Sequence, residues 1–166
     1  MDITIRAVRP EEYTELGEIT AQAYLGDGLL DFGEDDSYLP VLRDVARRAA
    51  EAEVLVAVDG RGRLLGGVTF VSGGGAWADV ARSDEAEFRM LAVAEQARGR
   101  GAGEALVRAC VERARGVEGC RRLVLSTQRS MLAAHRIYER MGFVRTPERD
   151  WGPILGITLL TYALEL

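Results

Sequence analysis

A glycine-rich turn between a predicted strand and a predicted helix limits what this 166-residue chain can fold into. The strand is expected over residues 87–93 (EFRMLAV), the turn over residues 98–103 (RGRGAG), and the helix starts with residues 104–107 (EALV). Glycines let a backbone pass close to a ligand, and the N–H groups at a helix N-terminus present positive charge to it. The segment therefore predicts a site for an anion such as a phosphate.

Composition and spacing exclude two common phosphate-binding loops. All 21 basic residues other than histidine are arginines, so the lysine that a Walker-type loop needs is missing. A dinucleotide-binding G-x-G-x-x-G motif fits poorly, because Gly99, Gly101 and Gly103 would place Glu104 at its third glycine. The net charge of −5 argues against nucleic acid as a partner, since nucleic-acid binders present positive charge to phosphates.

Length and composition predict one globular domain over residues 1–166, with 48% hydrophobic and 28% charged residues. Apolar runs are shorter than the ~20 residues of a membrane span, and the N-terminus lacks the layout of a signal peptide. We therefore expect no membrane partner and a cytoplasmic location. Cys110, Cys120 and His135 have no metal-ligand spacing, so no metal site is expected.

Hydrophobic periodicity predicts an α/β chain in which strands and helices follow one another. The predicted strands are residues 3–8, 54–58, 64–71, 87–93, 123–125, 143–145 and 157–166. The predicted helices begin after Pro10, cover residues 39–49 with Arg43, Arg47 and Arg48 on the polar side, begin at Gly103, and cover residues 131–141. Strands 54–58 and 64–71 should form an antiparallel hairpin.

A second motif follows the glycine loop (residues 98–103) in the order that one enzyme superfamily shows. Residues 134–143 (AHRIYERMGF) resemble the A-x-x-L-Y-E-x-x-G-F segment of GNAT N-acetyltransferases, and Arg98 to Gly103 resembles their R-x-x-G-x-G loop. The resemblance covers nearly the whole chain. It implies a mixed, mostly antiparallel sheet of about six to seven strands flanked by about four helices. One departure is Met131, where the family often has a cofactor-contacting asparagine.

The resemblance implies acetyl-coenzyme A as acyl donor. Its pyrophosphate would bind at Arg98, Gly99, Arg100, Gly101, Ala102, Gly103 and Glu104. Its pantetheine arm would bond like an extra strand to the backbone around Leu91, Ala92 and Val93. A backbone N–H of the same stretch would stabilise the oxyanion. The side chains of Arg98 and Arg100 either add charge-assisted bonds to phosphates or are solvated.

Acetyl transfer to an amine needs a base, because an alkylamine with a pKa near ~10 is mostly protonated at neutral pH. Glu87 is the candidate, since some family members carry a general-base glutamate at this position. Even spacing predicts that Glu87 shares a strand face with Leu91 and Val93. The alternative is a solvent-facing glutamate, with a chain of waters acting as the base.

The departing thiolate needs a proton, and Tyr138 matches the tyrosine of the family motif. A phenol with a pKa near ~10 can protonate a thiolate whose conjugate acid has a pKa near ~8.5, although a helix tyrosine often only packs. His135 lies four residues before Glu139, so only a surface contact between these two side chains is expected for it.

The expected function is acetyl-CoA-dependent N-acetylation of a primary amine of a small molecule, by direct attack through a tetrahedral intermediate. A cationic acceptor is favoured by an acidic segment (residues 25–37), although such a segment can also be a solvated loop. Its acidic residues are Asp27, Asp31, Glu34, Asp35 and Asp36. The alternatives are a protein or peptide N-acetyltransferase and a catalytically silent acyl-CoA sensor. A homodimer is also expected, because dimers are frequent among the relatives.

Overall fold

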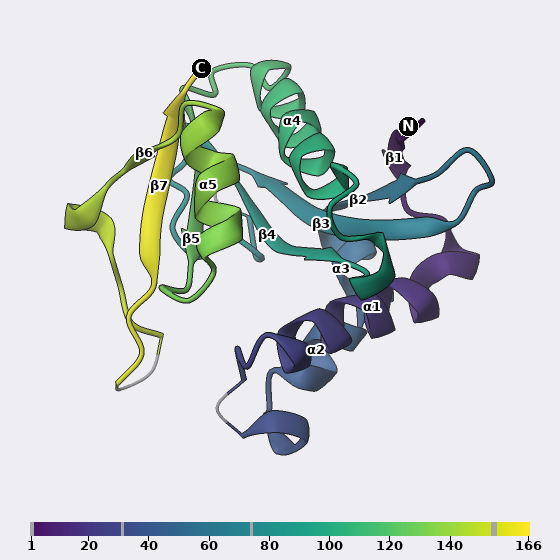
Figure 1. Ribbon diagram of the computed structural model, residues 1–166. Coiled ribbons are helices and arrows are strands. Elements are labelled where there is room, and N and C mark those ends of the chain that lie inside the picture. Colours follow the sequence, from purple (N-terminus) through teal and green to yellow (C-terminus); the bar gives the residue numbers. More distant parts are fainter. Residues whose placement is uncertain (1, 31, 74, 154–155) are drawn as a thin grey trace. The chain divides into compact units, whose positions relative to one another are not determined.

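A mixed sheet organises the computed structural model, which describes residues 2–30, 32–73, 75–153 and 156–166 (Figure 1). The strands of the described residues are β1 (Thr4–Ala7), β2 (Glu53–Val58), β3 (Leu64–Ser72), β4 (Glu85–Val93), β5 (Arg122–Thr127), β6 (Val144–Arg145) and β7 (Leu160–Glu165). Their order is β1-β2-β3-β4-β5-β7-β6. Pairing is antiparallel for β1/β2, β2/β3, β5/β7 and β6/β7, and parallel for β4/β5. The predicted mixed, mostly antiparallel sheet is confirmed.

One predicted helix is wrong in its extent. Residues 39–49 do not form one helix, because the chain leaves helical geometry at Asp44 (φ −86°, ψ 67°). The Asp44 carboxylate accepts the N–H of Arg47 at 3.2 Å and so acts as the N-cap of a new helix. The α-helices of the described residues are therefore α1 (Tyr13–Gly26), α2 (Leu39–Arg43), α3 (Val45–Glu51), α4 (Ala102–Arg115) and α5 (Leu132–Arg140).

Arg48 was expected on the polar side of that helix, but its side chain is buried. Its Nη1 donates to the carbonyl oxygens of Val41 and Leu42 at 2.7 and 2.9 Å. These carbonyls lie in the last turn of α2, where helical carbonyls lack a full set of intrahelical donors; the Val41 oxygen also accepts the N–H of Asp44 at 3.3 Å. Arg48 thus joins α3 to α2, a role that the periodicity of the sequence does not reveal.

The chain divides into two compact units, and three elements contribute to both. The first unit comprises Met1–Phe70 with Met90–Cys110, and the second comprises Val71–Arg89 with Val111–Leu166. Strands β3 and β4 and helix α4 each cross from one set of residues to the other. The single domain over residues 1–166 stays a prediction, and the two units are described separately below.

The core of the first unit lies between helices α1 and α3 and strands β2 and β3. Leu16 of α1 and Val45 of α3 are 1% exposed and belong to one cluster with the valines of β2 and with Leu64 of β3. The three valines are Val54, Val56 and Val58. In the described part of the chain, no helix combines the length and apolar character needed to cross a membrane.

The core of the second unit contains a group of aromatic rings. Tyr138 of α5 lies 5.8 Å from Phe88 of β4, 5.9 Å from Phe143 and 5.7 Å from Tyr162 of β7, measured between ring centroids. Such tilted ring pairs contribute stability beyond the area they bury. Helix α5 is thereby fixed against β7, beside which it runs in Figure 1.

An ion pair closes the connection between β6 and β7. Both terminal nitrogens of Arg145 donate to the two carboxylate oxygens of Asp150 at 2.8 Å, and Asp150 Oδ1 also accepts the N–H of Thr161 at 2.9 Å. The hydrogen bond from Arg145 lowers the pKa of Asp150 to about 2. Such bidentate arginine–carboxylate bonds are among the stronger ones in proteins.

We predict that Asp150→Asn lowers the free energy of unfolding by roughly 1–3 kcal/mol at pH 7. The pKa of Asp150 is depressed in the folded state, so its contribution is present above the unfolded pKa near ~4. It is lost as the pH falls from there toward about 2. Urea unfolding at pH 7 and at pH 3 measures the difference between the two proteins. An equal difference at both pH values would contradict this assignment.

Candidate functional site

The end of β4 in the first unit is held close to β3. The N–H of Ala94 donates to the carbonyl of Leu65 at 2.8 Å. Gly66 permits this approach, because a Cβ atom there would lie 2.3 Å from the Ala92 carbonyl oxygen and 3.0 Å from Val93 Cα. The backbone that was predicted to bind the pantetheine arm, residues 91–93, is therefore a rigidly supported strand end.

The glycine loop has the backbone geometry that the sequence predicts for an anion site. Gly99 and Gly101 have φ values of +78° and +86°, which strain any residue with a side chain. A Cβ at either glycine would meet no heavy atom of the described residues within 4 Å, so space is open there. Helix α4 begins at Ala102, and the N–H groups of its first turn have no acceptor within the helix. These features fit a pyrophosphate.

A mostly acidic groove borders the first residue of this loop, Arg98. The two terminal nitrogens of Arg98 lie 3.3 Å from the carboxylate oxygens of Asp27, and both side chains are nearly half exposed, so the pair is weak. The groove has a volume of about 490 Å³ and lies between α1 and residues 94–98. The charged residues of its lining are Glu15, Glu18, Asp27, Glu95 and Arg98. The groove therefore favours a cationic group over an anionic one.

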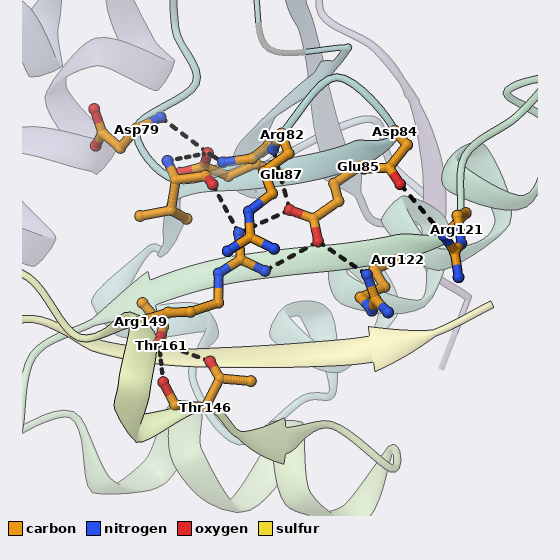
Figure 2. Close-up of polar contacts among 12 residues, drawn as sticks. Asp79, Arg82, Asp84, Glu85, Glu87, Arg121, Arg122, Thr146, Arg149 and Thr161 are labelled. Atoms are coloured by element: carbon orange, nitrogen blue, oxygen red, sulfur yellow. Dashed lines mark hydrogen bonds and ion pairs between the residues drawn. The ribbon is translucent and has the colours of Figure 1, made fainter.

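Glu87 in the second unit is buried, with 0% of its surface exposed. Its Oε1 accepts the N–H groups of Asp79, Val80 and Ala81 at 2.9, 2.9 and 3.0 Å; Figure 2 shows Glu87 beside Asp79. We call residues 79–81 the amide turn. Glu87 Oε2 is also buried and has no hydrogen-bond partner among the described residues. The alternative of a solvent-facing strand glutamate is therefore wrong.

Two carboxylates of β4 have pKa values that shift in opposite directions. Burial raises the pKa of Glu87, and the hydrogen bonds from the amide turn only partly oppose this effect. Burial acts in the same sense on Glu85, but the hydrogen bonds and charges of Arg149 and Arg82 together outweigh it and leave the pKa of Glu85 below its ordinary value. Arg149 donates to Glu85 at 2.7 and 3.0 Å (Figure 2). Carboxylates so separated can serve different roles at neutral pH.

Within β4, the backbone of Met90 adopts a left-handed conformation, with φ at +56°. A positive φ is rare for a residue with a side chain and interrupts the two-residue alternation of a strand. The prediction that Glu87 shares a strand face with Leu91 and Val93 assumed regular alternation of side chains across residue 90. Because Met90 interrupts that alternation, the shared face does not follow from the spacing.

Helix α5 of the second unit carries the remaining candidates. Tyr138 is 3% exposed within the aromatic group described above. His135 was expected at the surface but is buried, and its Nε2 lies 3.0 Å from the Gln128 carbonyl oxygen and 3.3 Å from Thr127 Oγ1. That expectation is wrong because α5 turns this face toward β5. Met131 accepts a hydrogen bond from Thr127 Oγ1 through Sδ at 3.5 Å.

Sequence reasoning missed the groups that surround Glu87. The amide turn acts through backbone N–H groups, which no residue pattern marks, and Arg149 lies 64 residues from Glu85. The available signal was the presence of two glutamates, Glu85 and Glu87, in one apolar strand. Ionised carboxylates are rarely buried without partners, so this pattern indicates that polar groups from elsewhere in the chain contact them. No group of side chains among the described residues is arranged to hold a metal ion.

The chain belongs to the Acetyltransferase (GNAT) family, whose sequence profile matches residues 14–143. Members of this family use acetyl-CoA as the acetyl donor. The two motifs quoted above, including the glycine loop and Tyr138, lie within the matched residues. No curated protein sequence matches the chain.

Solved structures share the fold over nearly the full length. A GNAT-family acetyltransferase from Staphylococcus aureus is 15% identical, with 99% of each chain covered and a TM-score of 0.75. A phosphinothricin acetyltransferase from Sinorhizobium meliloti, in complex with acetyl-CoA, is 17% identical and has a TM-score of 0.75; the alignment covers 100% of this chain and 89% of that one. Salmonella typhimurium yncA with its cofactor acetyl-CoA is 19% identical, with 100% and 95% covered and a TM-score of 0.70.

Proposed function

We propose that this protein transfers the acetyl group of acetyl-CoA to a primary amine of a small, cationic molecule. The observation that carries the proposal is the environment of Glu87, a buried carboxylate with one saturated oxygen and a pKa above its ordinary value. A base is most effective when its pKa approaches the working pH. Family membership supports the reaction class.

The donor would bind through backbone groups of the first unit. The open side of Gly99 and Gly101 and the first-turn N–H groups of α4 would hold the pyrophosphate, since both features favour an anion. The strand end at residues 91–93 would bond the pantetheine arm and supply the oxyanion donor. When bound, acetyl-CoA supplies a thioester carbon that an amine can attack.

Glu87 would remove the proton that the amine loses as its nitrogen bonds to the acetyl carbon. The proton goes to Oε2, because Oε1 already accepts three N–H groups. Oε2 is buried, so the proton must reach it through a bridging water or after a local movement of the groups that cover it. Tyr138 would then donate its hydroxyl proton to the thiolate that leaves when the tetrahedral intermediate collapses.

The acidic groove of the first unit supports a cationic acceptor. Four of its five charged lining residues are carboxylates, and Asp27 pairs only loosely with Arg98. Among the described acidic residues of the segment, Asp27 lines the groove, whereas the Asp36 carboxylate accepts the N–H of Tyr38 at 2.9 Å. Asp31 lies outside the described residues.

Detection of released thiol tests the function directly. We expect turnover of acetyl-CoA with polyamines or other cationic small amines, and slower turnover with amino acids and peptides. Turnover confined to peptides would favour a peptide N-acetyltransferase. Thermal stabilisation by acetyl-CoA with no turnover on any amine would favour a sensor. Molar mass from light scattering tests the expected homodimer.

We predict that Gly101→Val weakens acetyl-CoA binding by at least about tenfold, the effect of losing a well-formed hydrogen bond to a charged group. The new side chain would occupy the open side of the loop and strain a backbone with φ +86°. Gly62→Val is the matched control, because Gly62 has φ +80° and equally open surroundings in the β2–β3 turn. Isothermal titration calorimetry measures both variants. Wild-type affinity in Gly101→Val would contradict the loop assignment.

A further inference from the structure

One peptide group of the second unit connects Arg149 to Glu87. The carbonyl oxygen of Val80 accepts a hydrogen bond from Arg149 Nη2 at 2.8 Å. The N–H of the same peptide group belongs to Ala81 and donates to Glu87 Oε1 at 3.0 Å. The Arg149 guanidinium thus bonds the carbonyl end of this peptide group, and the Glu87 carboxylate bonds its N–H end. Figure 2 shows the side chains of Arg149 and Glu87.

Arg149 is itself held in place by a second carboxylate. It lies at the end of the short 3-10 helix η4 (Pro147–Arg149), and the Glu85 side chain that it contacts is 0% exposed. Glu85 also accepts the N–H of Arg82 at 3.1 Å and lies 3.5 Å from Arg122 Nη1. The guanidinium therefore has a fixed direction toward the Val80 carbonyl.

We propose that Arg149 is a positioning residue for acetyl transfer, which acts on Glu87 through the peptide group between Val80 and Ala81. This inference rests on the proposed role of Glu87 as general base. Arg149 does two things in this account. It holds the amide turn in the orientation that saturates Oε1, so that Oε2 is the oxygen left to take a proton. It also polarises the Val80–Ala81 peptide and strengthens the N–H bond that Ala81 donates.

Loss of Arg149 should therefore make the carboxyl of Glu87 a weaker acid, because a weaker hydrogen bond stabilises the carboxylate less. Other charges act on the same group and must be kept constant in the test. The charged groups around Glu87, from its own strand, the β3–β4 connection, β5 and η4, are Glu85, Arg89, Asp79, Arg82, Arg122 and Arg149.

The test uses the full chain with Arg149→Gln combined with Glu85→Gln, because Arg149→Gln alone would take from a buried carboxylate its nearest cation. The pair is removed together, so the net charge near Glu87 is unchanged. Glu85→Gln alone keeps Arg149 and its bond to Val80, and Arg121→Gln removes an exposed arginine that pairs with Asp84 at 3.8 Å. The carboxyl of Glu87 is titrated by carbon NMR, and amide hydrogen exchange is measured for residues 79–81.

In the double variant, we expect the titration midpoint of Glu87 and the acid limb of kcat/KM to move upward together. Exchange of the three amides should quicken on the order of tenfold, the factor that one lost hydrogen bond is worth. Neither change should occur in Arg121→Gln, and Glu85→Gln, which removes the carboxylate that holds Arg149 but keeps the bond to Val80, should give no more than part of each. A double variant with wild-type midpoint and exchange would overturn the inference, as would a shift reproduced in full by Glu85→Gln alone. An acid limb that persists in Glu87→Gln would instead reject the base role, whatever the NMR titration shows.

Discussion

Replacing Glu87 by glutamine is expected to lower kcat/KM for the amine by about 10²- to 10⁴-fold, the range over which a positioned general base accelerates reactions. The variant should also lose the acid limb of the wild-type profile, because that limb reports protonation of the Glu87 carboxyl. Rates are measured from pH 5 to pH 10 at saturating acetyl-CoA. A profile identical to that of the wild type would leave deprotonation to water or to another residue.

The same substitution should also change how the free energy of unfolding depends on pH, and this measurement establishes whether the variant is folded. A glutamine oxygen can still accept the N–H groups of the amide turn, so the turn should persist. In the wild type the pKa of Glu87 is raised by folding, so its stabilising contribution is complete below the unfolded pKa. That contribution is lost as the pH rises through the folded pKa. Glu87→Gln should remove this pH dependence in urea unfolding, and a variant less stable than the wild type at every pH would argue for a purely structural glutamate.

Replacing Tyr138 by phenylalanine is expected to lower kcat by about 10²-fold or more while acetyl-CoA binding changes little. The substitution removes only the hydroxyl, so the ring contacts with Phe88, Phe143 and Tyr162 remain. The thiolate would then have to leave without its proton donor. Steady-state kinetics and calorimetric titration with acetyl-CoA separate the two effects.

Tyr162→Phe is the matched control for Tyr138→Phe. Tyr162 belongs to the same aromatic group, and its hydroxyl donates to Glu139 at 3.3 Å. It lies on β7 and outside the family motif, so we expect a kcat close to that of the wild type. Equal losses in the two variants would show that the aromatic group supports packing alone, and an unchanged kcat in Tyr138→Phe would remove this residue from the acid role.

Much of the fold could be predicted because local pattern and tertiary packing agree. The β-rich runs at residues 54–58 and 64–71 matched the hairpin of β2 and β3, and the glycine-rich loop matched the positive φ values at Gly99 and Gly101. The split at Asp44 was missed because apolar spacing continues across the break, while the cap that creates it is a single side-chain bond.

The candidate site was less predictable because its geometry depends on distant and backbone groups. The sequence pointed to Glu87, but its burial follows from the amide turn, whose N–H groups are available in any sequence. Arg149 reaches Val80 across 69 residues, and no local pattern indicates such a contact. Met90 breaks the strand alternation without being a glycine, so the predicted strand faces could not be carried through it.

Transfer of an isotope-labelled acetyl group tests the central claim most directly. The protein is incubated with acetyl-CoA labelled in the acetyl carbons and with cationic primary amines, and the products are identified by mass spectrometry and NMR. We predict that the label appears as an amide on the amine nitrogen, at a rate that depends on Glu87. Labelled acetyl-CoA that binds to the protein yet gives no labelled amide with any primary amine would contradict the account.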